Sequence, residues 1–244
     1  MKIFIDTANL EDIEEALKRG FVRGITTNPS ILAKEPKAKF EEHIGKIVEL
    51  IKKYQPGISL SVEVFSRDPK EILLQANNFI NTFKYKELAV KVQVGWSELE
   101  VIRQLAQVGV AVNCTCCMTI NQAVMAAAAG ARYVSLFWGR IRDGGEKPEH
   151  LETRLKLREE RSLEDKDFDP SYVVSETRKI FDQQYPGVEI IAGSMRGAVD
   201  VKNAALAGAH IVTVSPKLFP QMVNHFKTDE VVQQFLTDFE KWLT

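Results

Sequence analysis

A single lysine interrupts the apolar segment ELAVKVQV, residues 87–94. The valines, leucine and alanine around Lys91 predict a strand that is buried on both faces. Burial disfavours the charged form of an amine, and a neutral amine can attack a carbonyl carbon to form a Schiff base. Lys91 is therefore a candidate nucleophile, although a structural ion pair with the carboxylate of Glu63 would also explain a lysine at this position.

Other polar residues fall at or just after the ends of further predicted strands. They include carboxylates, hydroxyls, amides and arginines: Asp6, Thr26, Thr27, Asn28, Glu63, Asn113, Thr115, Ser135, Arg140, Ser194 and Arg196. Two arginines and a serine can grip a tetrahedral anion. Taken alone, Asp6 could merely cap a helix that begins near Leu10. Together, an amine, two carboxylates and an anion site indicate Schiff-base carbon–carbon chemistry on an anionic sugar.

The elements that must position these residues alternate along the whole chain. Apolar segments typical of strands occur at 2–6, 23–27, 59–64, 88–94, 110–116, 132–137, 188–194 and 210–215. Amphipathic, helix-like stretches separate them, for example 10–18, 40–53, 70–83, 98–107 and 121–129. Eight strands alternating with helices predict a parallel sheet with right-handed crossovers. At 244 residues the chain has the length of an α/β (β/α)₈ barrel, a TIM barrel.

A doubly wound open sheet would alternate in the same way, but no G-x-G-x-x-G follows the first strand and no phosphate-binding P-loop motif occurs. In a barrel the active site lies at the carboxyl ends of the strands, where the polar residues fall. We expect a single domain over residues 1–244. A charged insertion at roughly 142–169 follows the sixth strand; it predicts either a solvated surface segment or a flap over the site.

Composition excludes several classes of protein. A formal net charge of -1 provides no electrostatic reason for a nucleic-acid or membrane-surface partner. The N-terminus does not resemble a signal peptide, and no apolar run is long enough to cross a bilayer. The three cysteines lie between positions 114 and 117 without a nearby histidine, so we expect no metal site and a reducing, cytoplasmic location.

The last 16 residues, DEVVQQFLTDFEKWLT, predict an extra amphipathic helix after the eighth strand. Its apolar stripe, which includes Phe235, Phe239 and Trp242, could dock on its own barrel or on a neighbouring subunit.

Ordered motifs over the full length resemble the transaldolase family, in particular its short bacterial and archaeal branch, which includes the fructose-6-phosphate aldolases. The matching segments are FIDTANL (4–10), GITTNPSIL (24–32), S-x-E-V (61–64), A-V-K-V (89–92), N-C-T (113–115), AGARYVSLFWGRI (129–141), AGSMR (192–196) and LAGAHIVTVSPKL (206–218). The resemblance implies that Lys91 is the Schiff-base lysine, which takes a dihydroxyacetone unit from a ketose phosphate such as fructose 6-phosphate or sedoheptulose 7-phosphate and transfers it to an aldose phosphate.

The same resemblance implies the other roles. Asp6 would be the general acid/base, and Glu63 with Thr115 would hold the catalytic water. The substrate-binding residues would be Thr27, Asn28, Asn113, Ser135, Phe137 and Trp138, and the anion-binding residues Arg140, Ser194 and Arg196. No metal or organic cofactor is implied, since the lysine iminium itself accepts electrons. The short members form rings, which implies a homo-oligomer, a pentamer or a decamer.

Two positions distinguish activities within the family. The aldolase members have glutamine in place of Glu63 and tyrosine in place of Phe137, so transfer is favoured here over release of free dihydroxyacetone. Gln93, Trp138 and Gly197 depart from the usual motifs. This leaves open a sulfosugar transaldolase that cleaves 6-deoxy-6-sulfofructose to 3-sulfolactaldehyde, with neutral donors from Trp138 or Gln93 holding the sulfonate. A non-catalytic barrel that binds a sugar phosphate is a further alternative.

Overall fold

The computed structural model of the chain describes all 244 residues and forms a closed barrel of eight parallel strands. Each strand pairs with its neighbours in chain order, and β8 pairs with β1 to close the barrel. The strands are β1 (Lys2–Asp6), β2 (Val22–Thr26), β3 (Ser59–Glu63), β4 (Leu88–Gln93), β5 (Ala111–Cys117), β6 (Tyr133–Phe137), β7 (Glu189–Gly193) and β8 (Ile211–Val214). The predicted (β/α)₈ barrel is confirmed.

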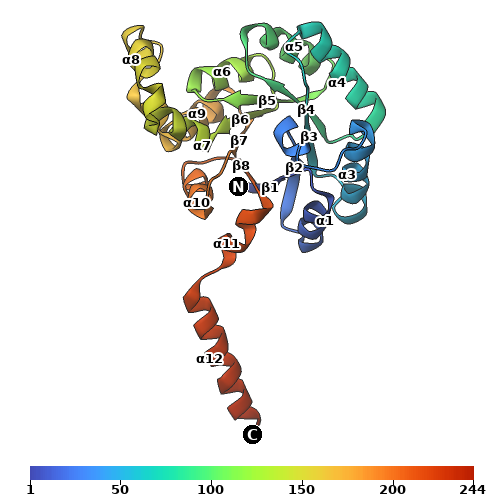
Figure 1. Cartoon of the computed structure of the whole chain (residues 1–244), viewed down its shortest axis with the longest axis vertical. Helices are drawn as coiled ribbons and strands as arrows, with labels where there is room; N and C mark the ends of the chain where they lie inside the picture. The colour runs from blue at the N-terminus through green and yellow to red at the C-terminus, as the bar shows by residue number, and fades with distance from the viewer.

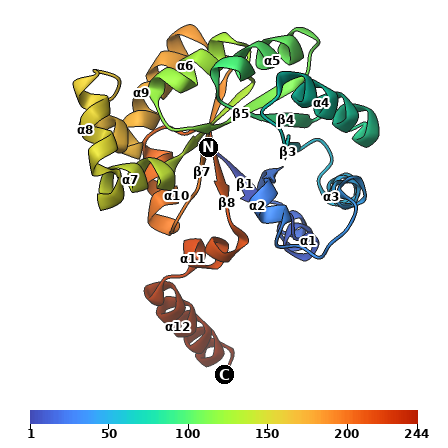
Figure 2. The ribbon, with the colours of Figure 1, turned by 45° about the horizontal axis from the view of Figure 1, so that its top comes forward.

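Helices surround the strands (Figures 1 and 2). The helices between β1 and β6 are α1 (Leu10–Arg19), α2 (Pro29–Leu32), α3 (Phe40–Tyr54), α4 (Pro69–Phe83), α5 (Trp96–Gln107) and α6 (Ile120–Ala128). These helices pack on the strands because the apolar face of a helix is buried against the barrel. In α1 this face consists of Ile13, Ala16 and Leu17, and the helix ends at Gly20 with a left-handed φ of 76°.

The interior of the barrel is a packed core rather than a channel. Phe4, Ile191 and Ile211 are buried and cluster inside the barrel, with the partly buried Tyr133 against them. A side chain at position 24 would clash with this layer, because a Cβ on Gly24 would lie 2.5 Å from the Phe4 ring. Gly24 therefore makes room for Phe4, and the catalytic end of the barrel rests on an apolar floor.

The segment between β6 and β7 contains α7 (Trp138–Glu146), the 3₁₀ turn η1 (Pro148–His150), α8 (Leu151–Glu159), the 3₁₀ turn η2 (Asp165–Phe168) and α9 (Pro170–Gln184). Helix α8 has no buried residue and lies at the periphery of the molecule (Figures 1 and 2). The surplus residues are thus helical and largely exposed, in agreement with the prediction of a solvated surface segment.

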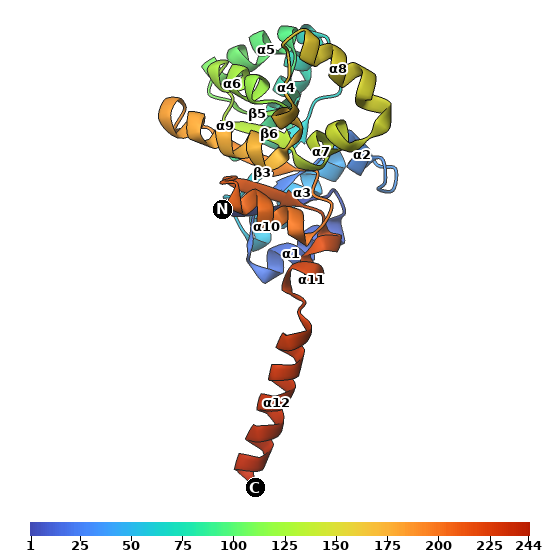
Figure 3. The same ribbon diagram turned by 90° about the vertical axis from the view of Figure 1, so that its left-hand side faces the viewer.

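The chain ends with α10 (Ala198–Leu206), the 3₁₀ turn η3 (Pro216–Leu218), α11 (Phe219–Val223) and α12 (Phe226–Leu243). The predicted C-terminal extra helix is confirmed as α12, which projects away from the barrel (Figures 1 and 3). All of its residues are exposed, including Phe235 (65% exposed) and Trp242 (77% exposed). Its apolar stripe does not dock on its own barrel.

No helix of the chain combines the length and the apolar character that crossing a membrane requires.

Candidate active site

A cavity of about 750 Å³ opens at the carboxyl ends of the strands. Its volume lies in the range of small-molecule sites, roughly 300–1,000 Å³. Most of the residues predicted for the site line it: Asp6, Asn28, Glu63, Lys91, Ser135, Phe137, Arg140, Ser194 and Arg196. These residues come from six strands or the segments that follow them, so the barrel brings together what the sequence separates.

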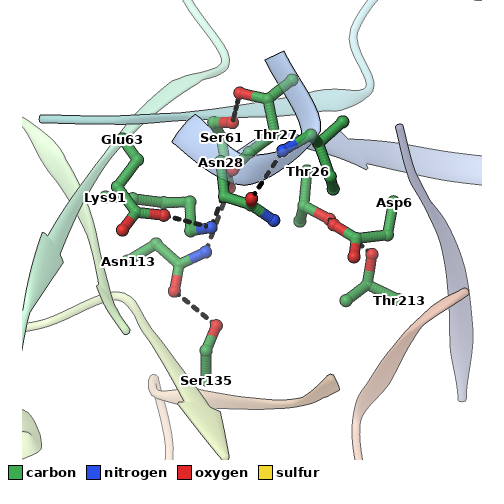
Figure 4. A network of polar contacts seen from close by, with 11 residues as sticks. Asp6, Thr26, Thr27, Asn28, Ser61, Glu63, Lys91, Asn113, Ser135 and Thr213 are labelled. Carbon is green, nitrogen blue, oxygen red and sulfur yellow. Dashed lines mark hydrogen bonds and ion pairs between the residues drawn. The ribbon is translucent and has the colours of Figure 1, made fainter. Parts of the chain in front are cut away.

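The amine of Lys91 is held at the base of this cavity. Its Nζ donates to Oε2 of Glu63 at 2.8 Å and to the backbone oxygen of Thr27 at 2.8 Å (Figure 4). The side chains of Lys91 and Glu63 are only 6% and 14% exposed. The ion pair considered for Lys91 is therefore present, and it lies inside the cavity, where a substrate carbonyl could approach the amine.

Strand register explains why these side chains meet. Glu63 on β3 pairs with Lys91 on β4, and Lys91 pairs in turn with Asn113 on β5. Residues opposite one another on neighbouring strands point to the same face, so all three side chains point into the barrel. The carboxylate, the amine and the amide thus form a row across three strands.

Further hydrogen bonds connect the groups around the amine. The Ser135 hydroxyl donates to Oδ1 of Asn113 at 2.7 Å, and Nδ2 of Asn113 donates to the Ser61 hydroxyl at 3.2 Å. The Thr27 hydroxyl donates to the backbone oxygen of Ser61 at 3.1 Å. Asn113 and Thr27 are fully buried, so this network fixes the orientation of groups around Lys91 before any substrate arrives.

Asp6 lies across the cavity from this network (Figure 4). It does not cap α1, because the side chain of Asn9 accepts from the backbone N–H of Asp12 and performs that role. Its Oδ1 instead accepts a 2.6 Å hydrogen bond from the Thr26 hydroxyl. Burial raises the pKa of Asp6 above its ordinary value, although the charge of Lys91 and the Thr26 hydrogen bond act in the opposite direction. A carboxyl with a raised pKa can exchange a proton nearer neutral pH.

The residues predicted to bind an anion converge from two neighbouring segments. Arg140 lies in the first turn of α7, while Ser194 and Arg196 follow β7. The two segments touch at Gly139, whose backbone N–H donates to the backbone oxygen of Ser194 at 3.2 Å. A Cβ on Gly139 would lie 2.4 Å from that oxygen and 2.6 Å from Nε of Arg196. Only glycine permits this approach, which places Arg140 beside Ser194 and Arg196.

Carboxylates accompany the arginines of this region. Nη2 of Arg196 donates to Oδ2 of Asp143 at 2.9 Å, and Arg142 makes two hydrogen bonds to Asp200, at 2.7 and 3.3 Å. Burial opposes ionisation of Asp200, but hydrogen bonds from the Arg142 side chain and the Arg196 backbone outweigh it and hold the pKa of this carboxyl below its ordinary value. Residues 142–169 do not line the cavity; Arg142 and Asp143 act at its edge through these pairs.

Four of the predicted site residues do not line the cavity: Thr27, Asn113, Thr115 and Trp138. The backbone oxygen of Thr27 accepts from Lys91, and Asn113 accepts from Ser135. Both residues therefore hold a cavity-lining side chain in place without lining the cavity themselves. The Thr115 hydroxyl is buried and makes no hydrogen bond within the chain. Trp138 is 2% exposed and packs in the core, so its indole does not face an anion in the cavity.

Gln93 also turns away from the cavity, since its amide donates to the backbone oxygen of Ser66 at 2.8 Å and to Glu98 at 3.2 Å. Conversely, the structure places Thr213 and Cys116 on the cavity wall, although the sequence analysis did not propose them. Thr213 falls in the apolar segment 210–215 near its carboxyl end, so the strand-end criterion applied to the other strands would have identified it. Cys116 has a left-handed φ of 62°, beside an irregularity in the β5–β6 register, and no sequence pattern indicated it.

Comparison with known proteins identifies the family of the chain. Residues 3–243 match the family model described as transaldolase/fructose-6-phosphate aldolase. The chain is 36% identical over 242 residues to "Probable transaldolase 2" of Bacillus cereus, covering 99% of this chain and 98% of that protein. It is 35% identical over 241 residues to "Probable transaldolase" of Desulfotalea psychrophila, covering 99% of both chains.

Among solved structures, thiamine phosphate pyrophosphorylase from Pyrococcus furiosus is similar in fold, with a TM-score of 0.54 at 12% identity, over 88% of this chain and 85% of that one. At this identity the likeness concerns the barrel alone. The match to the family model and the curated relatives concern nearly the entire chain. The protein is therefore an enzyme of the aldolase/transaldolase type, and the chain belongs to the transaldolase/fructose-6-phosphate aldolase family.

Proposed function

We propose that this enzyme transfers a dihydroxyacetone unit from a ketose phosphate to an aldose phosphate through a Schiff base on Lys91. Fructose 6-phosphate and sedoheptulose 7-phosphate are the proposed donors. The observation that carries the proposal is the amine of Lys91, which is buried at the base of the cavity and within 2.8 Å of the Glu63 carboxylate. Glu63 can accept the proton that Lys91 must lose before its nitrogen attacks a carbonyl.

The first half of the reaction uses Lys91 and Asp6. Nζ of Lys91 attacks the C2 carbonyl of the donor, and loss of one water leaves an iminium. Asp6 removes the proton of the C4 hydroxyl, the C3–C4 bond breaks, and its electron pair moves into the iminium to form an enamine. The C4 oxygen becomes the carbonyl of the released aldose. The raised pKa of Asp6 suits a group that must accept this proton and later return it.

The second half reverses these bonds with a new aldehyde. The enamine carbon attacks the carbonyl of the acceptor, and Asp6 returns its proton to the oxygen that forms. Water then hydrolyses the iminium and frees Lys91. Glu63 and Thr115 are proposed to hold this water; the buried Thr115 hydroxyl has a free hydrogen-bonding capacity within the chain that suits this role.

The remaining residues are proposed to bind the substrate. Asn28 and Ser135 line the cavity beside Lys91 and are placed to bind sugar hydroxyls, with Phe137 packing beside them. Arg140, Ser194 and Arg196 line the cavity and are proposed to bind the phosphate at the far end of the sugar. Asn28 also accepts from the backbone N–H of Ile31 at 3.0 Å, so its side-chain oxygen is already fixed and its amide group can donate to substrate.

A sulfonated ketose, 6-deoxy-6-sulfofructose, is the second candidate donor, and one observation favours it. Asp143 neutralises part of the charge of Arg196, at 2.9 Å. A phosphate monoester carries about 1.5 to 2 negative charges at neutral pH, whereas a sulfonate carries one. An arginine already paired with a carboxylate suits the smaller charge. The donors expected from Trp138 and Gln93 do not contribute, since neither residue faces the cavity.

The experiment is intact-protein mass spectrometry after borohydride reduction, with fructose 6-phosphate and 6-deoxy-6-sulfofructose in parallel. The proposal expects a reduced dihydroxyacetone adduct on Lys91 from the phosphorylated sugar, and none in a Lys91→Ala variant. An adduct from the sulfonated sugar alone would identify the second candidate. A wild-type chain that turns over neither sugar and traps no adduct would favour a non-catalytic sugar-binding barrel. A chain that releases mainly free dihydroxyacetone would be an aldolase.

We further propose that the enzyme works as a cytoplasmic homo-oligomer, a pentamer or a decamer, in which α12 packs on a neighbouring copy. The support is the apolar stripe of α12, which its own barrel leaves uncovered. Light scattering coupled to size exclusion tests this proposal on the full chain. Replacing Phe235 and Phe239 by serine should convert the oligomer to smaller species, and a wild-type monomer at micromolar concentration would contradict it.

A further inference from the structure

Two threonine hydroxyls connect β8 to the carboxylate on β1. Oγ1 of Thr213 lies 2.5 Å from Oγ1 of Thr26, which in turn lies 2.6 Å from Oδ1 of Asp6 (Figure 4). The two threonines are only 7% and 2% exposed. All three side chains line the cavity. The proposed catalytic scheme uses Asp6 and leaves both hydroxyls without a role.

The register of the barrel strands fixes the positions of Asp6, Thr26 and Thr213. β1 lies between β2 and β8, and Asp6 is the register partner of Thr26. Thr213 is the register partner of Phe4, which points into the barrel two residues before Asp6. Thr213 therefore points into the barrel as well, at the boundary between the apolar floor and the polar layer above it. A hydroxyl at this boundary can reach only the polar layer.

The donor and acceptor capacities of these groups give the series of hydrogen bonds a direction. An ionised carboxylate only accepts hydrogen bonds, so the Thr26 hydroxyl must donate its single proton to Asp6. Thr26 can then only accept from Thr213, and Thr213 must donate. Each donor in such a series polarises the next, which strengthens the bond that reaches the carboxylate. The series runs toward Asp6 when Asp6 is ionised.

We propose that Thr213 is a positioning residue for the proton chemistry of Asp6. Its hydroxyl fixes the rotamer of Thr26 and thereby holds the Asp6 carboxylate ionised and in one orientation. This inference rests on the proposed role of Asp6 as the acid/base of carbon–carbon cleavage.

The charged groups around Asp6 act on its ionisation in opposite directions, so a hydrogen bond can still influence it. Lys91 on β4 and Lys34 after α2 favour the ionised form, while Glu63 on β3 opposes it. Burial is the largest influence and also opposes ionisation. From the two strands beside β1, the Thr26 hydroxyl is the side-chain hydrogen bond that reaches Asp6, and the Thr213 hydroxyl contacts Thr26 in turn. The hydroxyl series is thus a neutral device that counteracts burial without adding a charge.

The test compares Thr213→Val, which keeps the shape but removes the hydroxyl, with Thr213→Ser, which keeps the hydroxyl. One hydrogen bond contributes about 1 kcal/mol, so kcat for donor cleavage should fall about fivefold in the valine variant. The acidic limb of its pH–rate profile should move to higher pH, and the borohydride-trapped adduct on Lys91 should form as in the wild type. Thr213→Ser should restore the wild-type limb.

Thr177→Val is the matched control. Thr177 is fully buried, but its hydroxyl lies in α9, outside the cavity, and makes no hydrogen bond within the chain. This variant should retain the wild-type rate and pH profile. Should Thr213→Val not fold, Thr213→Ala removes the same hydroxyl without any added bulk and is measured instead.

The outcomes separate this inference from the proposed function. A wild-type chain that traps no adduct overturns both. A wild-type chain that traps the adduct, together with a valine variant whose acidic limb and kcat are unchanged, overturns the role of Thr213 alone. A loss of rate in the valine variant that Thr213→Ser does not restore, or that leaves the acidic limb in place, shows a packing role and also overturns it.

Discussion

Nζ of Lys91 lies 2.8 Å from Oε2 of Glu63, its register partner on β3, and both side chains are nearly buried. A buried ion pair is costly to form, but removing one member costs more, because the other charge is left without a partner. The same pair can lose its charges internally by transfer of one proton from the amine to the carboxylate. The proposed catalysis and the stability of the fold are therefore coupled at Lys91 and Glu63.

Replacing Lys91 by methionine should abolish turnover and the trapped adduct, and should lower the free energy of unfolding by about 3–5 kcal/mol. The cause of the instability is the stranded Glu63 carboxylate. Urea unfolding and borohydride trapping measure the two effects. The double variant Lys91→Met/Glu63→Gln serves as the control: it should recover most of the stability and none of the activity. Turnover in Lys91→Met would disprove the Schiff-base scheme.

Asp6→Asn should stabilise the protein at neutral pH while removing carbon–carbon cleavage. The pKa of Asp6 is raised in the folded state, chiefly by burial, so keeping it ionised at pH 7 costs folding free energy. A neutral asparagine avoids this cost and retains an oxygen for Thr26. Each kcal/mol gained raises the melting temperature by about 2–4 °C in a chain of this size. Thermal unfolding of both chains at pH 7 gives the comparison.

The stabilisation of the folded state by Asp6→Asn should be larger at high pH than at low pH. It should shrink as the pH falls through the raised pKa of Asp6 and disappear below about 3.9, the pKa of an unperturbed aspartate, where both states of the wild type are protonated. Asp182→Asn on the exposed face of α9 is the control, since a surface ion pair such as that with Arg178 contributes little. An Asp6→Asn variant less stable than the wild type at pH 7 would show that burial does not dominate.

Gly139→Ala should weaken binding of the anionic group without altering the nucleophile. The new methyl group would overlap the backbone oxygen of Ser194 and the guanidinium of Arg196. Overpacking of this kind costs about 1–3 kcal/mol, which corresponds to a rise in KM of roughly 5-fold to 150-fold. Steady-state kinetics with the phosphorylated donor measure it.

Gly187→Ala is the matched control for Gly139→Ala, because a Cβ at Gly187 meets no atom within 4 Å. It should leave KM unchanged. The reduced adduct on Lys91 should still form in Gly139→Ala at saturating donor. If KM in Gly139→Ala equals that of the wild type, the loops of Arg140 and Arg196 do not act together on the anion.

Phe137→Tyr should increase release of free dihydroxyacetone relative to transfer. Phe137 ends β6 and lines the cavity, and the resemblance implies tyrosine here in the aldolase members. A phenol hydroxyl can donate a proton to the enamine, which commits the bound unit to release. Chromatographic measurement of dihydroxyacetone with and without an aldose acceptor gives the ratio. Phe137→Leu, which adds no donor, should not increase release, and an unchanged ratio in Phe137→Tyr would refute the assignment.

The fold was largely predictable because its signals are local. The apolar segment 188–194 corresponds to β7 (Glu189–Gly193), and the amphipathic stretch 10–18 corresponds to α1 (Leu10–Arg19). Alternation of such segments leaves few topologies available. The helical structure within residues 142–169 was less apparent, because a charged exposed helix such as α8 lacks a clear apolar face.

The site was predictable at strand ends and less so behind them. Thr27 and Trp138 belong to matching motifs, but motif membership does not show whether a side chain lines the cavity or lies beneath its wall. Cys116 reaches the cavity only because the β5–β6 register shifts between Cys114 and Cys117 and the backbone turns left-handed there. Such a shift depends on packing across strands, which no single segment encodes.

The apolar floor made by Phe4, Ile191 and Ile211 has a consequence for the order of events. Because the barrel is filled below the layer of Lys91 and Glu63, every molecule must enter and leave the cavity through the same opening. In the proposed reaction, the aldose released from the donor therefore blocks the path of the acceptor until it has left. With a single entrance, the released aldehyde must leave before the acceptor aldehyde can enter. The barrel therefore imposes a ping-pong sequence on any transfer that Lys91 performs.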